Sequence, residues 1–195
     1  MQTANPSDIW PTLEIAKLIV GVLTPLSMAL LGWLLSQHLK RVDLIYWTNQ
    51  KLIEKRLLVY DQLAPDLNSL LCFYTWVGYW KEVSPKDAIH AKRNLDKTIH
   101  IYRHLFDDGV YNDYQAFIHL LFRTRTEKGS DAKIRSLIIS CDGNRTTDAH
   151  YKWIEEWNSC FAESKDAAAF SDIYASHDKL MNSLTSSFGI KISAA

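Results

Sequence analysis

Six basic or titratable side chains lie at helical spacing between positions 86 and 104. Successive members are three or four residues apart, which places them within about 80° of one helix face at 3.6 residues per turn. Arginine and lysine bind phosphate oxygens, and histidine adds charge as the pH falls. This basic stripe therefore indicates an anionic-ligand site for a nucleotide, an oligonucleotide or a lipid headgroup, and it consists of Lys86, His90, Arg93, Lys97, His100 and His104.

A second interpretation of the basic stripe stays open. The same pattern is typical of a solvated helix face, or of a face paired with acids on a neighbouring helix. His100 and His104 also have the spacing of a metal-ligand pair, but the glutamate of a His-Glu-x-x-His motif is missing, so we expect no metal site. The opposite side of this helix is predicted to be a core stripe, made by Ala88, Ala91, Leu95, Ile99, Tyr102 and Phe106.

A looser basic group surrounds a polar segment further along the chain, and aromatic residues follow it. Stacked bases need aromatic rings beside cations, although rings at helical spacing more often belong to a core. Trp153 and Trp157, one turn apart, are the pair that fits stacking best. The looser basic group consists of Arg123, Arg125, Lys128, Lys133 and Arg135.

Signals of catalysis are absent from the sequence. It contains no glycine-rich phosphate loop, no Gly-x-Ser-x-Gly elbow and no metalloprotease signature. We therefore expect no enzymatic activity, no catalytic residues and no cofactor. The chain has three cysteines without Cys-x-x-Cys spacing, and we expect all of them to be free thiols in a reducing cytosol.

An uncharged run from Leu18 to Leu35 limits function more than any motif does. With the residues that follow it, the run reaches the ~20 residues that a helix needs to cross a bilayer core. We predict a transmembrane helix at 13–39, an extracytoplasmic N-terminus at 1–12 and a cytosolic helical domain at 40–195. A cleaved signal peptide and a buried core helix are the alternatives; Asp8 and Glu14 disfavour the first, and the lack of a polar face disfavours the second.

The charges on either side of the run predict its orientation. Lys17 is the only basic residue before it, whereas Lys40, Arg41 and further lysines follow it. Basic residues close to a span stay on the cytoplasmic side, so the N-terminus is expected outside. Over the whole chain, 22 basic and 22 acidic residues balance, so the net charge predicts no partner.

The predicted span has two unlike faces. One is bulky, while the other is small or mildly polar, and small residues let helices approach closely in lipid. This second face predicts a helix interface or a pore lining, and Pro25 could act as a hinge; the alternative is a simple anchor in which the small residues are incidental. We refer to it as the small face, made by Lys17, Gly21, Thr24, Pro25, Met28 and Gly32.

The coarse pattern predicts an all-α fold in which the spanning helix continues into a cytosolic helical bundle. The helix should continue over 42–63, kink or restart at Pro65 and extend to about 82. Ser84 and Pro85 begin a further helix to about 106, which Asp107-Asp108-Gly109 should end. Further helices are expected at 111–122, 148–162 and 166–188, with a loop at 125–147 that holds a short strand or helical turn at 134–139.

The layout of one amino-proximal span followed by a helical cytosolic domain without a catalytic motif resembles the small membrane effectors of bacterial anti-phage defence, closest to the Hailong type. The resemblance covers the whole chain but rests on layout and on no diagnostic motif. It implies an oligomeric channel held shut by single-stranded DNA oligomers that a companion enzyme makes. Gly21, Thr24 and Met28 would then line the conducting path, and the basic stripe would bind the oligonucleotide.

The sequence thus favours a homo-oligomeric membrane channel or membrane-disrupting effector, gated by its cytosolic domain, in the bacterial inner membrane. A tetramer is the working assumption. The expected partners are membrane lipid and a nucleotide or single-stranded oligonucleotide. The alternative is a membrane-tethered protein-interaction module with no conducting pore.

Overall fold

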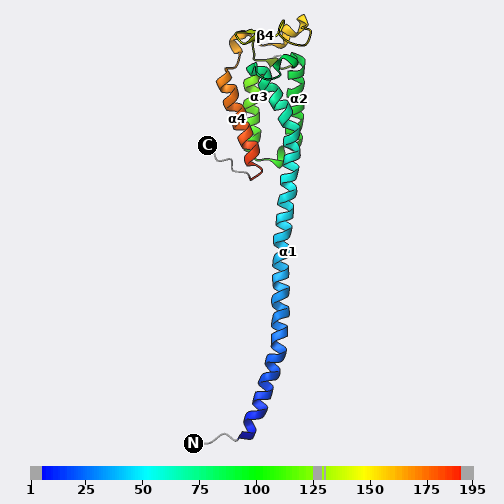
Figure 1. The fold of residues 1–195 in the computed structure, drawn as a ribbon, viewed down its shortest axis with the longest axis vertical. Helices are drawn as coiled ribbons and strands as arrows, with labels where there is room; N and C mark the ends of the chain where they lie inside the picture. Colours follow the sequence, from blue (N-terminus) through cyan, green and yellow to red (C-terminus); the bar gives the residue numbers. More distant parts are fainter. Residues whose placement is uncertain (1–5, 125–128, 130, 190–195) are drawn as a thin grey trace. The chain divides into compact units, whose positions relative to one another are not determined.

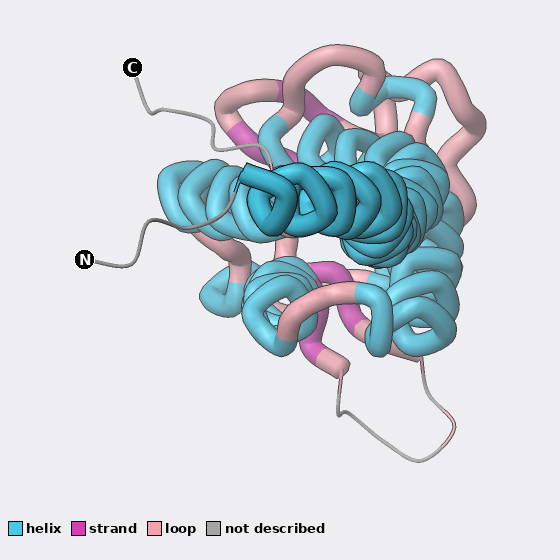
Figure 2. Tube along the Cα trace, turned by 90° about the horizontal axis from the view of Figure 1, so that it is seen from below, coloured by secondary structure: helices cyan, strands magenta, loops and turns pink. Residues whose placement is uncertain are grey.

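A computed structural model describes residues 6–124, 129 and 131–189, and its first element is α1 (Pro6–Thr75), a helix of 70 residues (Figure 1). The chain divides into two compact units between Lys51 and Leu52, and α1 contributes to both. All other elements belong to the second unit. The predicted all-α fold is confirmed: strands in the described part are two-residue segments within loops (Figure 2).

The second unit combines the last part of α1 with three α-helices and several short elements. The helices are α2 (Pro85–Tyr102), α3 (Asp108–Leu121) and α4 (Phe170–Ser186). Two antiparallel pairs are formed, β1 (Phe122–Arg123) with β2 (Lys133–Ile134) and β3 (Ile139–Ser140) with β4 (Gly143–Asn144). The 3₁₀ turns are η1 (Trp80–Glu82), η2 (Arg103–Leu105), η3 (Glu155–Cys160) and η4 (Ser164–Asp166).

One hydrophobic core holds the four helical segments of the second unit together. The apolar stripe predicted on α2 contributes to this core. Its first four members are buried, and the last two, Tyr102 and Phe106, are half-buried. Side chains from α1, α3 and α4 complete the core at helical spacing. They include Leu63, Leu67, Leu70, Phe73, Tyr114, Phe117, Leu121, Ile173, Leu180 and Leu184.

The start of α2 follows the sequence prediction, and its last turn is a 3₁₀ helix where an α-helix was expected. The Ser84 hydroxyl accepts a hydrogen bond from the Asp87 amide, and the Asp87 carboxylate accepts one from the Ser84 amide, which is a complete capping box. The α-helix ends at Tyr102 and tightens into η2. The helical run through η2 ends at Leu105, next to the expected end at about 106. Asp107 and Asp108 then begin α3, as its N-cap residue and in its first turn, where a negative charge is favoured.

Pro65 does not restart α1, although the sequence predicted a kink or a restart there. Proline removes the hydrogen bond to the carbonyl of Asp61, but both residues are exposed, so water can bind that carbonyl instead. The helix ends at Thr75, short of the expected 82. Trp76 follows with φ 59°, a left-handed conformation that terminates the helix.

The predicted helix at 148–162 is wrong. The segment is a loop with one 3₁₀ turn, η3, and its backbone groups bond to other parts of the second unit. The His150 amide donates to the Lys81 carbonyl and the Ala162 amide to the Ile134 carbonyl, both at 2.8 Å. These tertiary bonds outweigh local helix propensity. The last predicted helix exists, but α4 begins at Phe170 and not at 166.

Candidate functional site

The predicted membrane span forms part of α1, and no described side chain of that stretch is buried by the rest of the protein. Every residue from Leu13 to Lys51 is exposed. Within the described residues, α1 is the one helix long and apolar enough to cross a membrane. Burial in the protein's own core, one of the two alternatives, is therefore contradicted. The choice between a span and a cleaved leader, and the orientation, stay predictions.

The small face of α1 is uninterrupted helix. A Cβ atom added at Gly21 or Gly32 would meet nothing within 4 Å, so both positions are open to a close neighbour. The Thr24 hydroxyl donates to the Val20 carbonyl at 2.6 Å, which satisfies it within the helix. Pro25 has no N–H to donate to the Gly21 carbonyl, so that carbonyl lacks its usual helical partner. Gly21 itself has no side chain that could cover it.

All six residues of the basic stripe are exposed. Five lie on α2, while His104 lies in η2, where the tighter 3₁₀ geometry shifts it away from the regular helical spacing. The expectation of one continuous α-helical stripe is therefore wrong at its last member.

Two members of the basic stripe have partners. Arg93 forms an ion pair with Asp131, and because both side chains are more than half exposed, this pair is worth at most about 1 kcal/mol. The His100 Nδ1 atom lies 2.7 Å from the Asp96 carbonyl oxygen, and its ring packs edge-on against Tyr111. Among the described residues, the other four have no ion pair. The stripe thus keeps unpaired exposed cations at Lys86 and Lys97.

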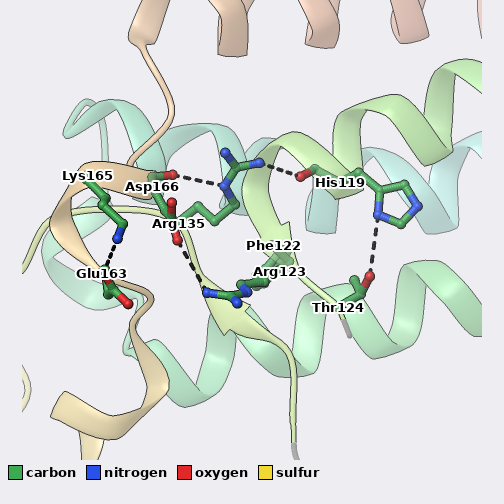
Figure 3. A pocket seen from close by; sticks show the side chains of 8 residues that line it. All are labelled: His119, Phe122, Arg123, Thr124, Arg135, Glu163, Lys165 and Asp166. Carbon is green, nitrogen blue, oxygen red and sulfur yellow. Dashed lines mark hydrogen bonds and ion pairs between the residues drawn. The ribbon is translucent and has the colours of Figure 1, made fainter. Parts of the chain in front are cut away.

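An open cleft of about 670 Å³ lies where the end of α3, the β1–β2 pair and η4 meet (Figure 3). It brings together two members of the looser basic group, Arg123 and Arg135. Lys133, a third member, donates to the Ser159 carbonyl, while Arg125 and Lys128 lie outside the described residues. The lining residues are His119, Phe122, Arg123, Thr124, Arg135, Glu163, Lys165 and Asp166.

The two arginines of the cleft are held differently. Arg135 donates from Nε to the Asp166 carbonyl and from Nη1 to the His119 carbonyl, both at 2.9 Å, so it caps the C-terminal end of α3. Arg123 reaches the Asp166 carboxylate only at 3.5 Å and is more than half exposed. Lys165 pairs with Glu163 at 2.7 Å. Figure 3 shows both guanidinium groups beside Asp166.

Arg145 is a fully buried guanidinium inside an aromatic cluster. Its Cζ atom lies 3.8 Å from the ring centroids of both Phe73 and Trp76. Its Nη2 donates to the Phe73 carbonyl at 2.7 Å and its Nε to the Leu137 carbonyl at 3.0 Å. These contacts join the end of α1 to the loop that carries β3 and β4. No carboxylate pairs with Arg145 within the described residues.

Burial changes the acid–base behaviour of Arg145. Loss of solvent lowers the pKa of its guanidinium to about 10, and the nearby Tyr151 and Tyr74 oxygens oppose the shift only in part. Burial also raises the pKa of Tyr74 well above its usual value. Arg145 still carries its charge at neutral pH, so the aromatic faces around it provide its electrostatic stabilisation.

Sequence reasoning missed the Arg145 cluster, because a lone arginine in a polar loop has no distinctive pattern. Cys72, Cys141 and Cys160 are free thiols, as predicted. A search of the described residues finds no group of three or more histidine, cysteine, aspartate or glutamate side chains arranged to hold a metal.

Comparisons with protein-family models, with curated proteins and with solved structures give no match. The resemblance to Hailong-type effectors therefore rests on the layout of the chain alone.

Proposed function

We propose that this protein is a homo-oligomeric membrane channel, or a membrane-disrupting effector, that its soluble helical domain gates. One observation carries the proposal: an apolar helix whose side chains are all exposed from Leu13 to Lys51. A surface of this size and polarity needs lipid and other helices to cover it. Trp33, which is exposed near the end of the uncharged run, suits the interfacial zone at that end of such a span, and Tyr46 and Trp47 lie beyond it.

The small face supports self-association. In hydrocarbon, helices associate through close packing of small residues, and Gly21 and Gly32 leave room for it. The Gly21 carbonyl, which Pro25 deprives of its donor, needs a polar partner or water at membrane depth. An assembly that turns this face inward supplies either one. A water-filled path lined by Thr24 and Met28 follows from the same arrangement.

Gating would use the length of α1. The helix that contains the span also contributes Val59, Leu63 and Leu67 to the core of the soluble unit. A ligand that binds two arrangements of that core unequally shifts the population between them, and α1 connects this change to the span. The basic stripe is the proposed ligand site, for a nucleotide or a single-stranded oligonucleotide.

The charges beside the span support an outside N-terminus and a cytosolic domain in the bacterial inner membrane. The proposed role in anti-phage defence comes from the resemblance of layout. A membrane-tethered interaction module without a pore is the alternative, and the two are separated by conduction.

The first test is to measure the mass and the conductance of the purified full-length protein. We expect an assembly of several copies, with four as the working number, and discrete single-channel currents after reconstitution into planar bilayers. Native mass spectrometry from detergent gives the copy number. A monomer that carries no current in either direction of applied voltage would contradict the channel and favour the tethered module.

A second test addresses the basic stripe. Reversing two exposed charges, Arg93→Glu together with Lys97→Glu, should weaken binding of short single-stranded DNA at least about tenfold at low salt and lower the salt dependence of log K by roughly 1.4. Fluorescence anisotropy of the full-length protein in nanodiscs measures both. Lys152→Glu, at another exposed lysine of the same unit, is the matched control. Equal affinity in all three proteins would leave the stripe as solvated surface.

A further inference from the structure

We infer that the cleft between α3, β1 and η4 is a phosphate-binding site, separate from the basic stripe. The main hydrogen-bond donor of the cleft is Arg135, which the surrounding backbone holds in place. The Arg135 amide donates to the Leu121 carbonyl at 2.8 Å, and the Arg135 carbonyl accepts from the Ala168 amide at 3.0 Å. Backbone bonds on both sides, together with two side-chain bonds, hold the Arg135 guanidinium in one place.

Arg135 has donors to spare. Its bonds to the carbonyls of His119 and Asp166 use Nε and Nη1, and both N–H groups of Nη2 are free of partners within the described residues. Capping α3 needs only the first two bonds. A helix cap alone therefore leaves unexplained a half-buried guanidinium that no described carboxylate neutralises.

Among the described residues that line the cleft, three cations face two carboxylates, which leaves one positive charge unbalanced. Lys165 is paired with Glu163, and the Asp166 carboxylate faces Arg123 at 3.5 Å, longer than a strong charged hydrogen bond. An anion between the two arginines would improve the pairing of Arg123 and supply the missing partner of Arg135. The lining thus favours an anion over a cation, although two carboxylates also border the cleft.

The donor geometry favours a phosphate group. Arg123 presents parallel N–H groups that match two oxygens, and Arg135 adds the two free N–H groups of Nη2, so the two arginines can share the oxygens of one phosphate. Phe122 is buried, so the exposed imidazole of His119 is the one ring in the lining on which a base could stack. The two arginines bind the phosphate group itself. A soluble nucleotide or a lipid headgroup could provide that group.

The test uses the full-length protein in phosphatidylcholine nanodiscs and inorganic pyrophosphate as the probe. Isothermal titration calorimetry should show binding that Arg123→Gln and Arg135→Gln each weaken about tenfold, the usual loss for one charged hydrogen bond. Arg123→Lys, which keeps the charge but not the fork, should fall between. Because Arg135 also caps α3, its variant can lose stability, and the exposed Arg123 keeps the test decisive.

Two controls separate the cleft from other cations. Lys97→Gln on the basic stripe and Lys152→Gln elsewhere should leave the pyrophosphate affinity within about twofold. Absence of binding to the wild type overturns the inference. So does binding that Lys97→Gln weakens and Arg123→Gln leaves unchanged.

Two further arms identify the source of the phosphate. Binding of ATP that Arg123→Gln weakens supports a soluble nucleotide. Capture of the nanodiscs by vesicles of phosphatidylcholine and phosphatidic acid, lost in the same variant, supports a lipid headgroup. If neither ligand responds to Arg123→Gln, the site is not a phosphate site. None of these results depends on conduction, so the inference and the proposed channel can fail separately.

Discussion

Replacing Arg145 by alanine should lower the free energy of unfolding of the second unit by about 3–5 kcal/mol, the largest stability loss expected for a single substitution in this protein. The change removes two ring contacts at 3.8 Å and leaves the buried Phe73 carbonyl and the part-buried Leu137 carbonyl without the donor that Arg145 supplies. It also opens a cavity at a side chain that is 0% exposed. Urea unfolding of the full-length protein in detergent, followed by tryptophan fluorescence, measures the loss.

The buried charge itself opposes part of this stability. Burial lowers the Arg145 pKa to about 10, which shows that loss of solvent disfavours the charged form of its guanidinium. Methionine fills much of the same volume without that cost, so Arg145→Met should lose only about 1–2 kcal/mol. We expect the free energy of unfolding to rise from Arg145→Ala to Arg145→Met to the wild type, and the two steps separate the effect of packing from that of charge.

Arg103 provides the matched control. Its guanidinium also stacks on an aromatic ring, 3.9 Å from the Tyr111 centroid, but the side chain is about half exposed. Arg103→Ala should therefore cost less than about 1 kcal/mol. If Arg145→Ala proves as mild as Arg103→Ala, the cluster does not join α1 to the β3–β4 loop in the way described.

The parts of the fold that local sequence determines were predictable. Ser84 and Asp87 begin α2 through contacts three residues apart, and the apolar stripe behind them is buried as the 3.6-residue period requires. The length of α1 through the uncharged run was equally clear. These features need no knowledge of the rest of the chain.

The features that failed depend on partners distant in sequence. Trp153 and Trp157 have helical spacing and their rings contact each other, yet Trp157 lies in η3 and Trp153 in the loop before it. The bonds to Lys81 and Ile134 fix the path of this segment. Pro65 favours a kink or a restart, but its exposed side lets the helix continue without a restart. Neither the tertiary bonds around η3 nor the exposure of Pro65 can be predicted from local sequence patterns.

The two candidate sites of the second unit also have a part that local sequence reveals and a part that only the fold reveals. Five of the six residues of the basic stripe lie on one helix, so the helical period alone was enough to find the stripe. The period could not predict the ion pair of Arg93 with Asp131. The cleft combines residues from α3, β1, the segment after β2 and η4. The sequence singled out Arg123 and Arg135 as basic, while only the fold brings His119 and Asp166 beside them.

Placing a large ring on the small face of the span should abolish conduction. Thr24→Trp replaces a small side chain, whose hydroxyl is bonded within the helix, by one that cannot fit a close helix contact or a narrow path. We expect the single-channel conductance of the reconstituted variant to fall at least about tenfold. Leu30→Trp puts the same ring on the bulky face, which is predicted to contact lipid, and should leave the conductance within about twofold.

The copy number of the two variants determines what the small face does. Loss of current with an unchanged assembly mass indicates that Thr24 borders the conducting path, because the subunits still associate. Loss of current together with a smaller mass indicates that the face is the helix interface, because the ring then prevents close packing. Either result supports a role for the small face in assembly or conduction. A Thr24→Trp protein that keeps both its mass and its current, or a Leu30→Trp protein that alone loses them, would assign assembly to the opposite side of α1.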